Sequence, residues 1–321
     1  MARALMPASW VMRVAGAWRQ HFTNPAEVPV PVVCVGNVTV GGGGKTPVVR
    51  DIAHRLRTAG INAITLSRGY GGRLSGPIAV DPSNHTAAEV GDEPLMLAGD
   101  GPAWVARNRA LGAGAAVDRG ADAIIMDDGH QNHSLRKTLS LLVVDPAVGF
   151  GNGRVFPAGP LREPARAGLD RADAVVFVRS RSDARRQSSP SRDGSGQAIL
   201  TAYTALHQPP DGGWKGRRVH VLAGIARPGK VVDTLTAAGA DVVGMSAFPD
   251  HHRFSELEAM AGLEAAVAHD AELVTTEKDL TRLPEPVARS ALVARIHLVW
   301  DDEPALERLL APIVTAGRVD R

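Results

Sequence analysis

The sequence has few of the residues that define several protein classes. Its 321 residues include one cysteine, Cys34, which excludes an internal disulfide and a cysteine-clustered zinc site. Aromatic residues make up 4% of the chain, so base-stacking platforms for nucleic acid are not expected. Lys and Arg number 36 against 34 Asp and Glu, and this balance predicts no nucleic-acid partner. No apolar run approaches the roughly 18 to 20 residues of a membrane-spanning helix, which disfavours an integral membrane protein.

The remaining composition is that of a globular protein, with 44% hydrophobic and 22% charged residues, and its length favours two domains. Short β-branched runs alternate with helical stretches from residue 30, which predicts parallel strands in a layered α/β fold. Strands are expected at 30–35, 61–66, 121–126, 139–144, 174–178, 219–223, 240–245, 272–275 and 295–299, and a helix at 46–59. A Ser-, Arg- and Gly-rich segment over 179–197 has no apolar period and predicts a linker or a disordered loop.

The first 22 residues contain three arginines and no acidic residue. At helical spacing, one side carries Trp10, Val11, Val14, Trp18 and Phe22. Two interpretations stay open. The segment is either a helix packed on its own domain, or an interfacial helix with its tryptophans at the level of the lipid headgroups. The tryptophans moderately favour the membrane.

The strongest local signal is GNVTVGGGGKTP at 36–47, which follows a buried strand and precedes a helix, the context of a phosphate-binding loop. Glycines let backbone N–H groups turn inward on phosphate oxygens. Lys45 is expected to reach the β- and γ-phosphates, and Thr46 to ligate Mg²⁺. The expected nucleotide-binding residues are Thr39, Val40, Gly41, Gly42, Gly43, Gly44, Lys45 and Thr46. The first motif position is Thr39 where glycine is usual, and a flexible glycine turn is the alternative interpretation.

A second nucleotide-site element is the apolar strand that ends in Asp127 and Asp128. A carboxylate at this place holds the Mg²⁺ shell in phosphate-loop enzymes, so the expected metal ligands are Thr46, Asp127 and Asp128. Strands also end in Asp for turn chemistry. A metal site without nucleotide, built from Asp127, Asp128 and His130, is a further alternative.

Several motifs are more specific than a phosphate loop, and with them the chain resembles the tetraacyldisaccharide 4′-kinases, also called lipid A 4′-kinases. The motifs are GNVTVGGGGKTP at 36–47, SRGYGG at 67–72, VGDEP at 90–94, DDGHQNHSL at 127–135, PAGPLREP at 157–164, DHH at 250–252 and TEKD at 276–279. The resemblance implies a P-loop NTPase-like α/β/α core with a parallel sheet and a second, smaller α/β domain. We expect an N-terminal amphipathic helix over 1–25, the kinase core over 26–200, and a second domain over 201–321 that closes the cleft.

The resemblance also implies the reaction. Such enzymes use ATP and Mg²⁺ to phosphorylate the 4′-hydroxyl of a tetraacylated glucosamine disaccharide-1-phosphate in lipid A synthesis. They work as peripheral proteins on the cytoplasmic face of the inner membrane, and we expect a monomer. The alternative is a P-loop GTPase of the metal-insertion or protein-targeting type, which reads guanine with an Asn/Thr-Lys-x-Asp segment. The nearest segment is TEKD at 276–279, with a Glu in the wrong place. A soluble small-molecule kinase is a third option.

Individual roles follow from the same resemblance. Asp92 matches the general base and His251 the histidine that supports it, while Lys45 acts on the transferring phosphate. Residues matching the substrate-binding set are Arg68, Tyr70, Arg109 and Glu163. Two alternatives stay open, because Asp92 is also an excellent helix N-cap and His251 can be a surface histidine beside a helix start. The chain departs from the family at Asn132, where His is usual, with His133 beside it, and at Arg227; no role is assigned there.

Overall fold

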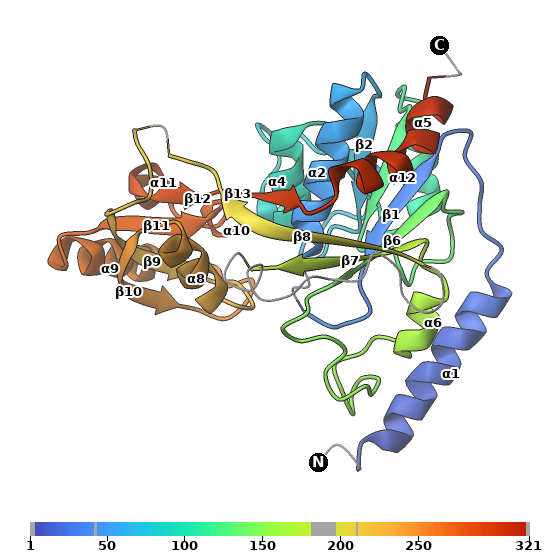
Figure 1. Cartoon of the computed structure of the whole chain (residues 1–321), viewed down its shortest axis with the longest axis horizontal. Coiled ribbons are helices and arrows are strands. Elements are labelled where there is room, and N and C mark those ends of the chain that lie inside the picture. Colours follow the sequence, from blue (N-terminus) through green and yellow to red (C-terminus); the bar gives the residue numbers. More distant parts are fainter. Residues whose placement is uncertain (1–3, 42–43, 181–196, 210, 319–321) are drawn as a thin grey trace. The chain divides into compact units, whose positions relative to one another are not determined.

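The computed structural model describes residues 4–41, 44–180, 197–209 and 211–318, and most of their helices and strands are labelled in Figure 1. The helices are α1 Met6–Phe22, α2 Lys45–Thr58, α3 Ala87–Val90, α4 Asp92–Asp100, α5 Arg109–Val117, α6 Ala165–Leu169, α8 Gly229–Ala237, α9 Glu256–Ala268, α10 Glu277–Leu280, α11 Glu285–Ser290 and α12 Glu303–Ala316. The strands are β1 Val32–Gly36, β2 Ala63–Ser67, β3 Ile78–Ala79, β4 Ala103–Val105, β5 Ala123–Asp127, β6 Leu139–Val144, β7 Ala174–Arg179, β8 Ala198–Leu206, β9 Arg218–Ala223, β10 Asp241–Ala247, β11 Glu272–Thr276, β12 Leu292–Ala294 and β13 Ile296–Trp300. Most of the expected linker, and Gly42 and Gly43 of the phosphate loop, lie outside the described residues.

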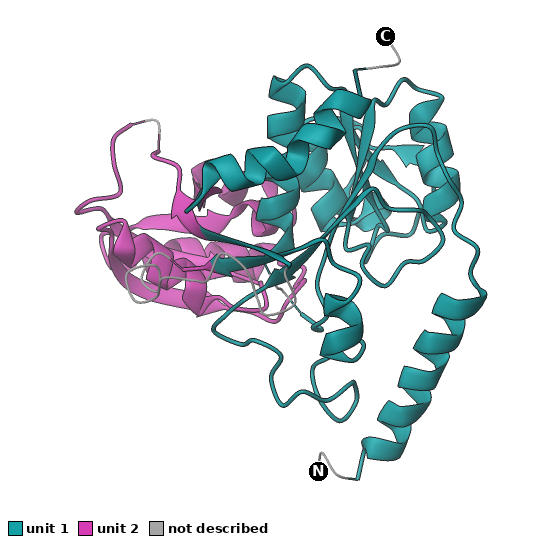
Figure 2. Ribbon diagram, turned by 45° about the vertical axis from the view of Figure 1, so that its right-hand side comes forward, with its two compact units in different colours: residues 1–178, 189–202, 300–321 teal, residues 179–188, 203–299 magenta. Residues whose placement is uncertain are grey.

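The chain divides into two compact units (Figure 2). Unit 1 comprises residues 1–178, 189–202 and 300–321, and unit 2 comprises 179–188 and 203–299. The C-terminal helix α12 therefore belongs to unit 1, whereas the sequence placed it in the second domain. Two contacts tie this segment to α2: Arg55 Nη1 lies 2.6 Å from Glu303 Oε2, and Trp300 Nε1 donates to Asp51 Oδ2 at 2.8 Å. The expected boundary near residue 200 falls inside β8, which contributes residues to both units.

A mainly parallel sheet forms the centre of unit 1. Within unit 1 its strand order is β8-β7-β6-β1-β5-β2-β4-β3, and each neighbouring pair from β7 to β4 is parallel. The strands β1, β2, β5 and β6 are buried along their whole length, which explains why they are apolar runs instead of alternating patterns. Helix α5 packs with Val32 and Cys34 of β1, while α2 packs on β1, β2 and β5 with its buried residues Val48, Val49, Ile52, Ala53 and Leu56. The predicted α/β class is confirmed.

Unit 2 is a smaller α/β unit with four parallel strands in the order β10-β9-β11-β12. Successive side chains of a strand point to opposite faces of the sheet. Val221 of β9 packs in one cluster with Leu235 of α8, while the next residue, Leu222, packs in another with Ala259 of α9. Helices therefore cover both faces of this sheet, and its loops rest on a rigid support.

Helix α1 contacts the rest of unit 1 through its buried residue, Ser9. Ser9 is 6% exposed, and its Oγ donates to Val155 O at 2.7 Å and accepts from Ala158 N at 3.0 Å. Trp10 and Trp18 are 63% and 62% exposed. The helix thus packs on its own unit and still presents an apolar side. In the described part of the chain, none of the helices combines the length and apolarity that crossing a bilayer requires.

Candidate active site

The segment expected to form the phosphate loop lies between the end of β1 and the start of α2. Gly44 occupies the N-cap of α2 with a φ of 76°, a left-handed conformation that favours glycine. Lys45 Nζ donates to Asn37 Oδ1 at 3.2 Å and lies 3.4 Å from Asp128 Oδ1. Thr46 is half-buried in the first turn of α2. Lysine, threonine and helix N-terminus therefore lie together, and their binding of phosphate and metal stays a prediction.

The strand-end acids lie beside this loop. Strands β1 and β5 are parallel neighbours with Val35 opposite Asp127, so both strands end at the same edge of the sheet. Asp127 is 2% exposed, and its Oδ1 has no hydrogen-bond partner among the described residues. Burial, reinforced by Glu93 and Asp128, raises the pKa of Asp127 to about 7. Burial also favours a higher pKa for Asp128. The positive charges of Lys45 and Arg162 outweigh burial, however, and hold the pKa of Asp128 below its usual range.

A chain of polar contacts runs from Lys45 to Glu163. Asp128, whose φ is 52°, accepts from Arg162 Nη1 at 2.8 Å through both of its oxygens. Arg162 Nη1 also lies 3.4 Å from Gln131 Oε1, and Gln131 Nε2 donates to Glu163 Oε1 at 2.8 Å. The phosphate loop is thus linked through side chains to the PLREP segment.

Backbone pairing supports the same link. Arg162 N donates to Val38 O, and Val40 N donates to Pro160 O, each at 2.7 Å. Glu163, an expected substrate-binding residue, accepts from Arg171 Nη2 at 2.7 and 2.6 Å. Sequence reasoning assigned no role to Arg162, Gln131 or Arg171. The first two stand inside the quoted motifs, and their polar character next to DDG and REP was the available signal.

A cavity of about 300 Å³ lies next to this chain of contacts, between α1 and the 131–167 region of unit 1. Its lining combines cations and apolar groups: Trp10, Met12, Arg13, Val14, Gly16, Ala17, Arg19, Gln20, Gln131, His133, Arg162, Glu163, Pro164 and Ala167. Asn132, the residue that departs from the family pattern, instead accepts from Ser134 Oγ at 2.9 Å within its own loop. His133 therefore takes the cavity-lining position, and burial lowers its pKa.

The SRGYGG and VGDEP motifs pack backbone against backbone. A Cβ on Gly91 would lie 2.6 Å from Tyr70 O, and one on Gly72 would lie 2.7 Å from Gly91 N. Arg68 and Tyr70 are exposed on this loop, Tyr70 by 73%. Asp92 is the first residue of α4, while Gly91, which has no side chain, occupies the cap position. The structure therefore does not support the interpretation of Asp92 as a helix cap.

Arg109 is enclosed in unit 1. It is 3% exposed, and its Nη1 donates to Ala106 O at 2.5 Å. Burial lowers the pKa of Arg109 to about 10, while Asp127 opposes that effect. Its charge therefore acts at Asp127, and the expected contact with substrate stays a prediction.

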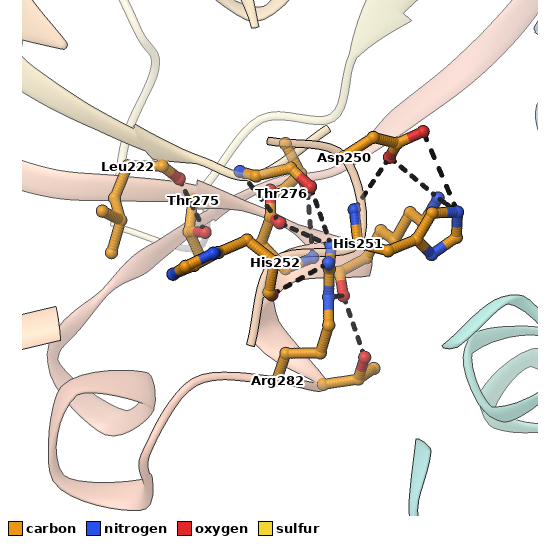
Figure 3. Close-up of polar contacts among 11 residues, drawn as sticks. Leu222, Asp250, His251, His252, Thr275, Thr276 and Arg282 are labelled. Atoms are coloured by element: carbon orange, nitrogen blue, oxygen red, sulfur yellow. Dashed lines mark hydrogen bonds and ion pairs between the residues drawn. The ribbon is translucent and has the colours of Figure 1, made fainter. Parts of the chain in front are cut away.

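In unit 2, the DHH segment follows β10 (Figure 3). His251 has a φ of 61°, and its backbone N donates to Gly224 O at 3.1 Å. Its Nε2 lies 3.2 Å from Lys278 Nζ. His252 has a different environment: its Nε2 lies 3.1 Å from Glu258 Oε2, and its ring stacks on Phe248. His252 is thus the histidine beside a helix start, whereas the pairing of His251 in unit 2 with Asp92 in unit 1 stays a prediction.

In the TEKD segment, the carboxylate of Asp279 makes its hydrogen bonds within unit 2. Asp279 is fully buried and accepts from Gly224 N at 3.1 Å, Thr276 Oγ1 at 2.7 Å and Arg282 Nη2 at 2.7 Å. In a GTPase this carboxylate would face guanine. The geometry therefore disfavours the GTPase alternative.

The alternative metal site without nucleotide is wrong. Over the described ranges, no group of three or more His, Cys, Asp or Glu residues is arranged to hold a metal ion. His130 is fully buried and lies with Nε2 2.9 Å from Gly168 O and Nδ1 3.4 Å from Ser140 Oγ. Burial lowers the pKa of His130 to about 4, so the ring is neutral and structural.

Comparison with known proteins identifies the relatives of this chain. A family described as tetraacyldisaccharide-1-P 4′-kinase matches residues 1–315. Proteins named tetraacyldisaccharide 4′-kinase from Rhodospirillum centenum and Caulobacter vibrioides are 49% and 46% identical. Each alignment covers 98% of this chain, and 92% and 94% of the respective relatives. The crystal structure of "apo" form LpxK from Aquifex aeolicus in complex with ATP is similar with a TM-score of 0.79 and 25% identity, covering 98% of this chain and 99% of that one.

Proposed function

This chain belongs to the tetraacyldisaccharide 4′-kinase family, and on that premise we propose that it transfers the γ-phosphate of ATP to the 4′-hydroxyl of a tetraacylated glucosamine disaccharide-1-phosphate. The observation that carries the proposal is the chain of contacts from Lys45 through Asp128 and Arg162 to Glu163. It joins a phosphate loop to a cavity lined by cations and by the apolar residues of α1. A phosphorylated lipid headgroup requires these two chemistries side by side.

The nucleotide end of the site uses the loop 39–46. Backbone N–H groups and Lys45 neutralise the phosphates, whose charge spreads during transfer. The residues Thr46, Asp127 and Asp128 fit a magnesium ion, because hard cations prefer oxygen ligands and Asp127 presents a buried oxygen without a hydrogen-bond partner among the described residues. When bound, Mg²⁺ neutralises phosphate charge and orients the transferring group.

The acceptor end requires a base. A sugar hydroxyl is a poor nucleophile at neutral pH, and a positioned base contributes about 10²- to 10⁴-fold in rate. We assign this role to Asp92, the first residue of α4 in the VGDEP motif, and we assign His251 to orienting its carboxylate. Because the two residues belong to different units, their pairing would couple proton removal to domain closure.

Membrane association completes the proposal. The exposed tryptophans of α1 suit the headgroup region, and its arginines suit anionic lipid. We therefore place the protein as a peripheral monomer on the cytoplasmic face of the inner membrane, where its lipid acceptor is reached without extraction.

The test is transfer of labelled phosphate from ATP to the lipid disaccharide, compared with soluble sugar and nucleoside acceptors and with GTP as donor. We expect transfer to the lipid with ATP and Mg²⁺, and loss of at least about 10²-fold in kcat for Lys45→Met. Chelation of Mg²⁺ by EDTA should abolish transfer. Equal transfer to a soluble sugar or nucleoside, or preference for GTP, would contradict the proposal.

A further inference from the structure

A lysine outside the quoted motifs holds the turn that follows the strand-end acids. Lys137 lies two residues after the DDGHQNHSL motif and two residues before β6. Its Nζ donates to Gly129 O at 2.8 Å and to His130 O at 3.0 Å. These carbonyls belong to the two residues that directly follow Asp127 and Asp128. Because an ammonium makes stronger hydrogen bonds than a neutral donor, the lysine fixes the backbone of this turn.

The backbone that carries Lys137 is itself anchored to the segment leading into β1. Arg136 N donates to Ala26 O at 2.9 Å, and Thr138 N donates to Val32 O at 2.8 Å. Thr138 Oγ1 also accepts from Val32 N at 3.0 Å, so the chain is hydrogen-bonded on both sides of the lysine. Since β1 leads directly into the candidate phosphate loop, the ammonium has a fixed place relative to that loop.

The turn held by Lys137 packs closely on the end of β1. A Cβ on Gly36 would lie 2.5 Å from His130 Cβ, and a Cβ on Gly129 would lie 3.1 Å from Cys34 Sγ. Glycine at both positions lets the two backbones approach each other this closely. The turn is therefore confined between β1 and the lysine ammonium.

Asp128 needs such support, because its backbone is left-handed. Its φ of 52° is uncommon for residues other than glycine, and such conformations persist where the surrounding structure holds them. In this conformation both carboxylate oxygens accept from Arg162 Nη1 at 2.8 Å, and Oδ1 lies 3.4 Å from Lys45 Nζ. The next carbonyl along the chain, that of Gly129, is one of the two that Lys137 binds. The place of the Asp128 carboxylate thus depends on the backbone that the lysine fixes.

We propose that Lys137 is a positioning residue for the phosphate transfer: its ammonium holds the backbone of 128–130 so that the carboxylates of Asp127 and Asp128 stay beside the phosphate loop. The proposal rests on the proposed function, in which these carboxylates serve Mg²⁺. The lysine acts through the backbone, and its role requires no contact with nucleotide, metal or lipid. Loss of a group that orients metal ligands typically lowers metal affinity about 10- to 100-fold.

The test compares Lys137→Met, which keeps the length of the side chain without its donors, with Lys137→Arg, which keeps a cationic donor. We expect Lys137→Met to raise the Mg²⁺ concentration for half-maximal rate about 10- to 100-fold, with KM for the lipid within a few-fold of wild type. Lys137→Arg should recover most of the loss. The matched control is Arg136→Met, because this neighbouring cation is 68% exposed and pairs with the exposed Glu27.

Two outcomes of this experiment would overturn the proposal. One is a wild-type Mg²⁺ requirement in Lys137→Met, even with a lowered melting temperature, since the lysine would then contribute to stability alone. The other is an equal rise in Arg136→Met. If Lys137→Met does not fold, Lys137→Gln, which keeps an amide donor without the charge or the reach, should show the raised Mg²⁺ requirement, and a wild-type value there would also overturn the proposal.

Hydrogen exchange of the protein without substrates tests the turn separately from the reaction. Asn132 N donates to the Gly129 carbonyl at 2.9 Å, so peptides covering 127–132 report on this turn. We expect them to exchange about 5-fold faster or more in Lys137→Met, because buried carbonyls lose their donor, and at the wild-type rate in Arg136→Met. Unchanged exchange in Lys137→Met would overturn the proposal.

Metal binding without turnover completes the test. Binding of Mn²⁺ in the presence of a non-hydrolysable ATP analogue, followed by electron paramagnetic resonance, should weaken in Lys137→Met by about the same factor as the Mg²⁺ requirement. Equal Mn²⁺ binding in Lys137→Met and wild type would overturn the proposal. A wild-type protein that binds no Mn²⁺ with the nucleotide would instead contradict the proposed function, and the exchange result would still decide whether Lys137 holds the turn.

Discussion

Arg162 places Nη1 2.8 Å from each carboxylate oxygen of Asp128, and Lys45 Nζ approaches one of these oxygens at 3.4 Å. One strand-end carboxylate is therefore shared between the phosphate loop and the cavity that Arg162 lines. In the proposed function, phosphates bound at the loop would compete with Asp128 for Lys45. In the proposed function, Asp128 would therefore lie between the nucleotide and the lipid acceptor.

Arg162 gives the first prediction. Arg162→Gln should raise KM for the lipid about 10-fold or more, because a hydrogen bond to a charged group contributes about 1.5–3 kcal/mol. KM for ATP should stay within a few-fold. Arg166→Gln is the matched control, since that side chain is 93% exposed and does not line the cavity. Steady-state kinetics with vesicle-bound lipid measure both values, and an unchanged lipid KM in Arg162→Gln would remove Arg162 from the acceptor site.

Asp92 gives the second prediction, in which stability and activity separate. Because Gly91 occupies the cap of α4 and asparagine has nearly the shape of aspartate, Asp92→Asn should leave the melting temperature within about 2 °C of wild type. The same change should lower kcat about 10²-fold or more if the carboxylate accepts the hydroxyl proton. ATP affinity, measured by calorimetry, should change little. An active and stable Asp92→Asn enzyme would show that another group is the base.

The sequence predicted the elements that have long apolar patterns. The strands expected at 139–144 and 219–223 match β6 and β9 at or within one residue of their ends, because each is a continuous buried run. The strands β3, β4 and β12 were missed, since two or three residues carry no period. The strand β8 was also missed: it directly follows the Ser- and Arg-rich segment, and its exposed and buried positions do not alternate regularly.

In the candidate site, too, some features could be predicted from the sequence and others could not. The places of Lys45 and Asp127 follow from strand, loop and helix in sequence order, so local reasoning found them. The contacts of Arg162 with Asp128 and of Lys278 with His251 join residues 34 and 27 positions apart. Such contacts depend on how segments pack, which periodicity does not encode. The assignment of α12 to unit 1 was unpredictable for the same reason, since it depends on Arg55 and Asp51 of α2.

Glu258 gives a prediction about acid stability. Hydrogen bonds from Ser255, together with His252, lower the pKa of Glu258 to about 2 from an ordinary value of 4.5. A carboxylate whose folded-state pKa is depressed contributes stability above about pH 4.5, and this contribution is lost as the pH falls towards 2. Amide protection of α9, measured by hydrogen exchange between pH 5 and 2, should therefore decline over this window.

The matched variants are Glu258→Gln and Glu256→Gln, both in the first turn of α9. Glu258→Gln should lower the protection at pH 5 and flatten its decline with acid, because the titrating capping group is gone. Glu256→Gln should follow the wild-type curve. Identical curves for Glu258→Gln and wild type would mean that the capping box and its contact with His252 contribute nothing measurable.

Helix α1 gives the last prediction, because its exposed tryptophans can be changed separately from the serine that packs on unit 1. Trp10 and Trp18 are exposed, whereas Ser9 is buried and hydrogen-bonded to the 155–158 segment. Changing both tryptophans to Ser should release the protein from anionic vesicles, since burying each indole transfers on the order of 150–250 Å² of surface at about 25 cal/mol per Å². The melting temperature should stay close to wild type, because exposed side chains contribute little to folding.

The control for membrane binding is Ser9→Ala. It removes the buried hydroxyl that hydrogen-bonds α1 to the 155–158 segment, so it should lower stability by about 0.5–1.5 kcal/mol, the net contribution of a typical hydrogen bond. The apolar side of the helix is unchanged, and vesicle binding should therefore persist. Salt should weaken only the part contributed by the arginines, about 1 kcal/mol each near an anionic surface. If the tryptophan variant instead loses stability and keeps its vesicle binding, α1 is a packing helix and the membrane is reached through another surface.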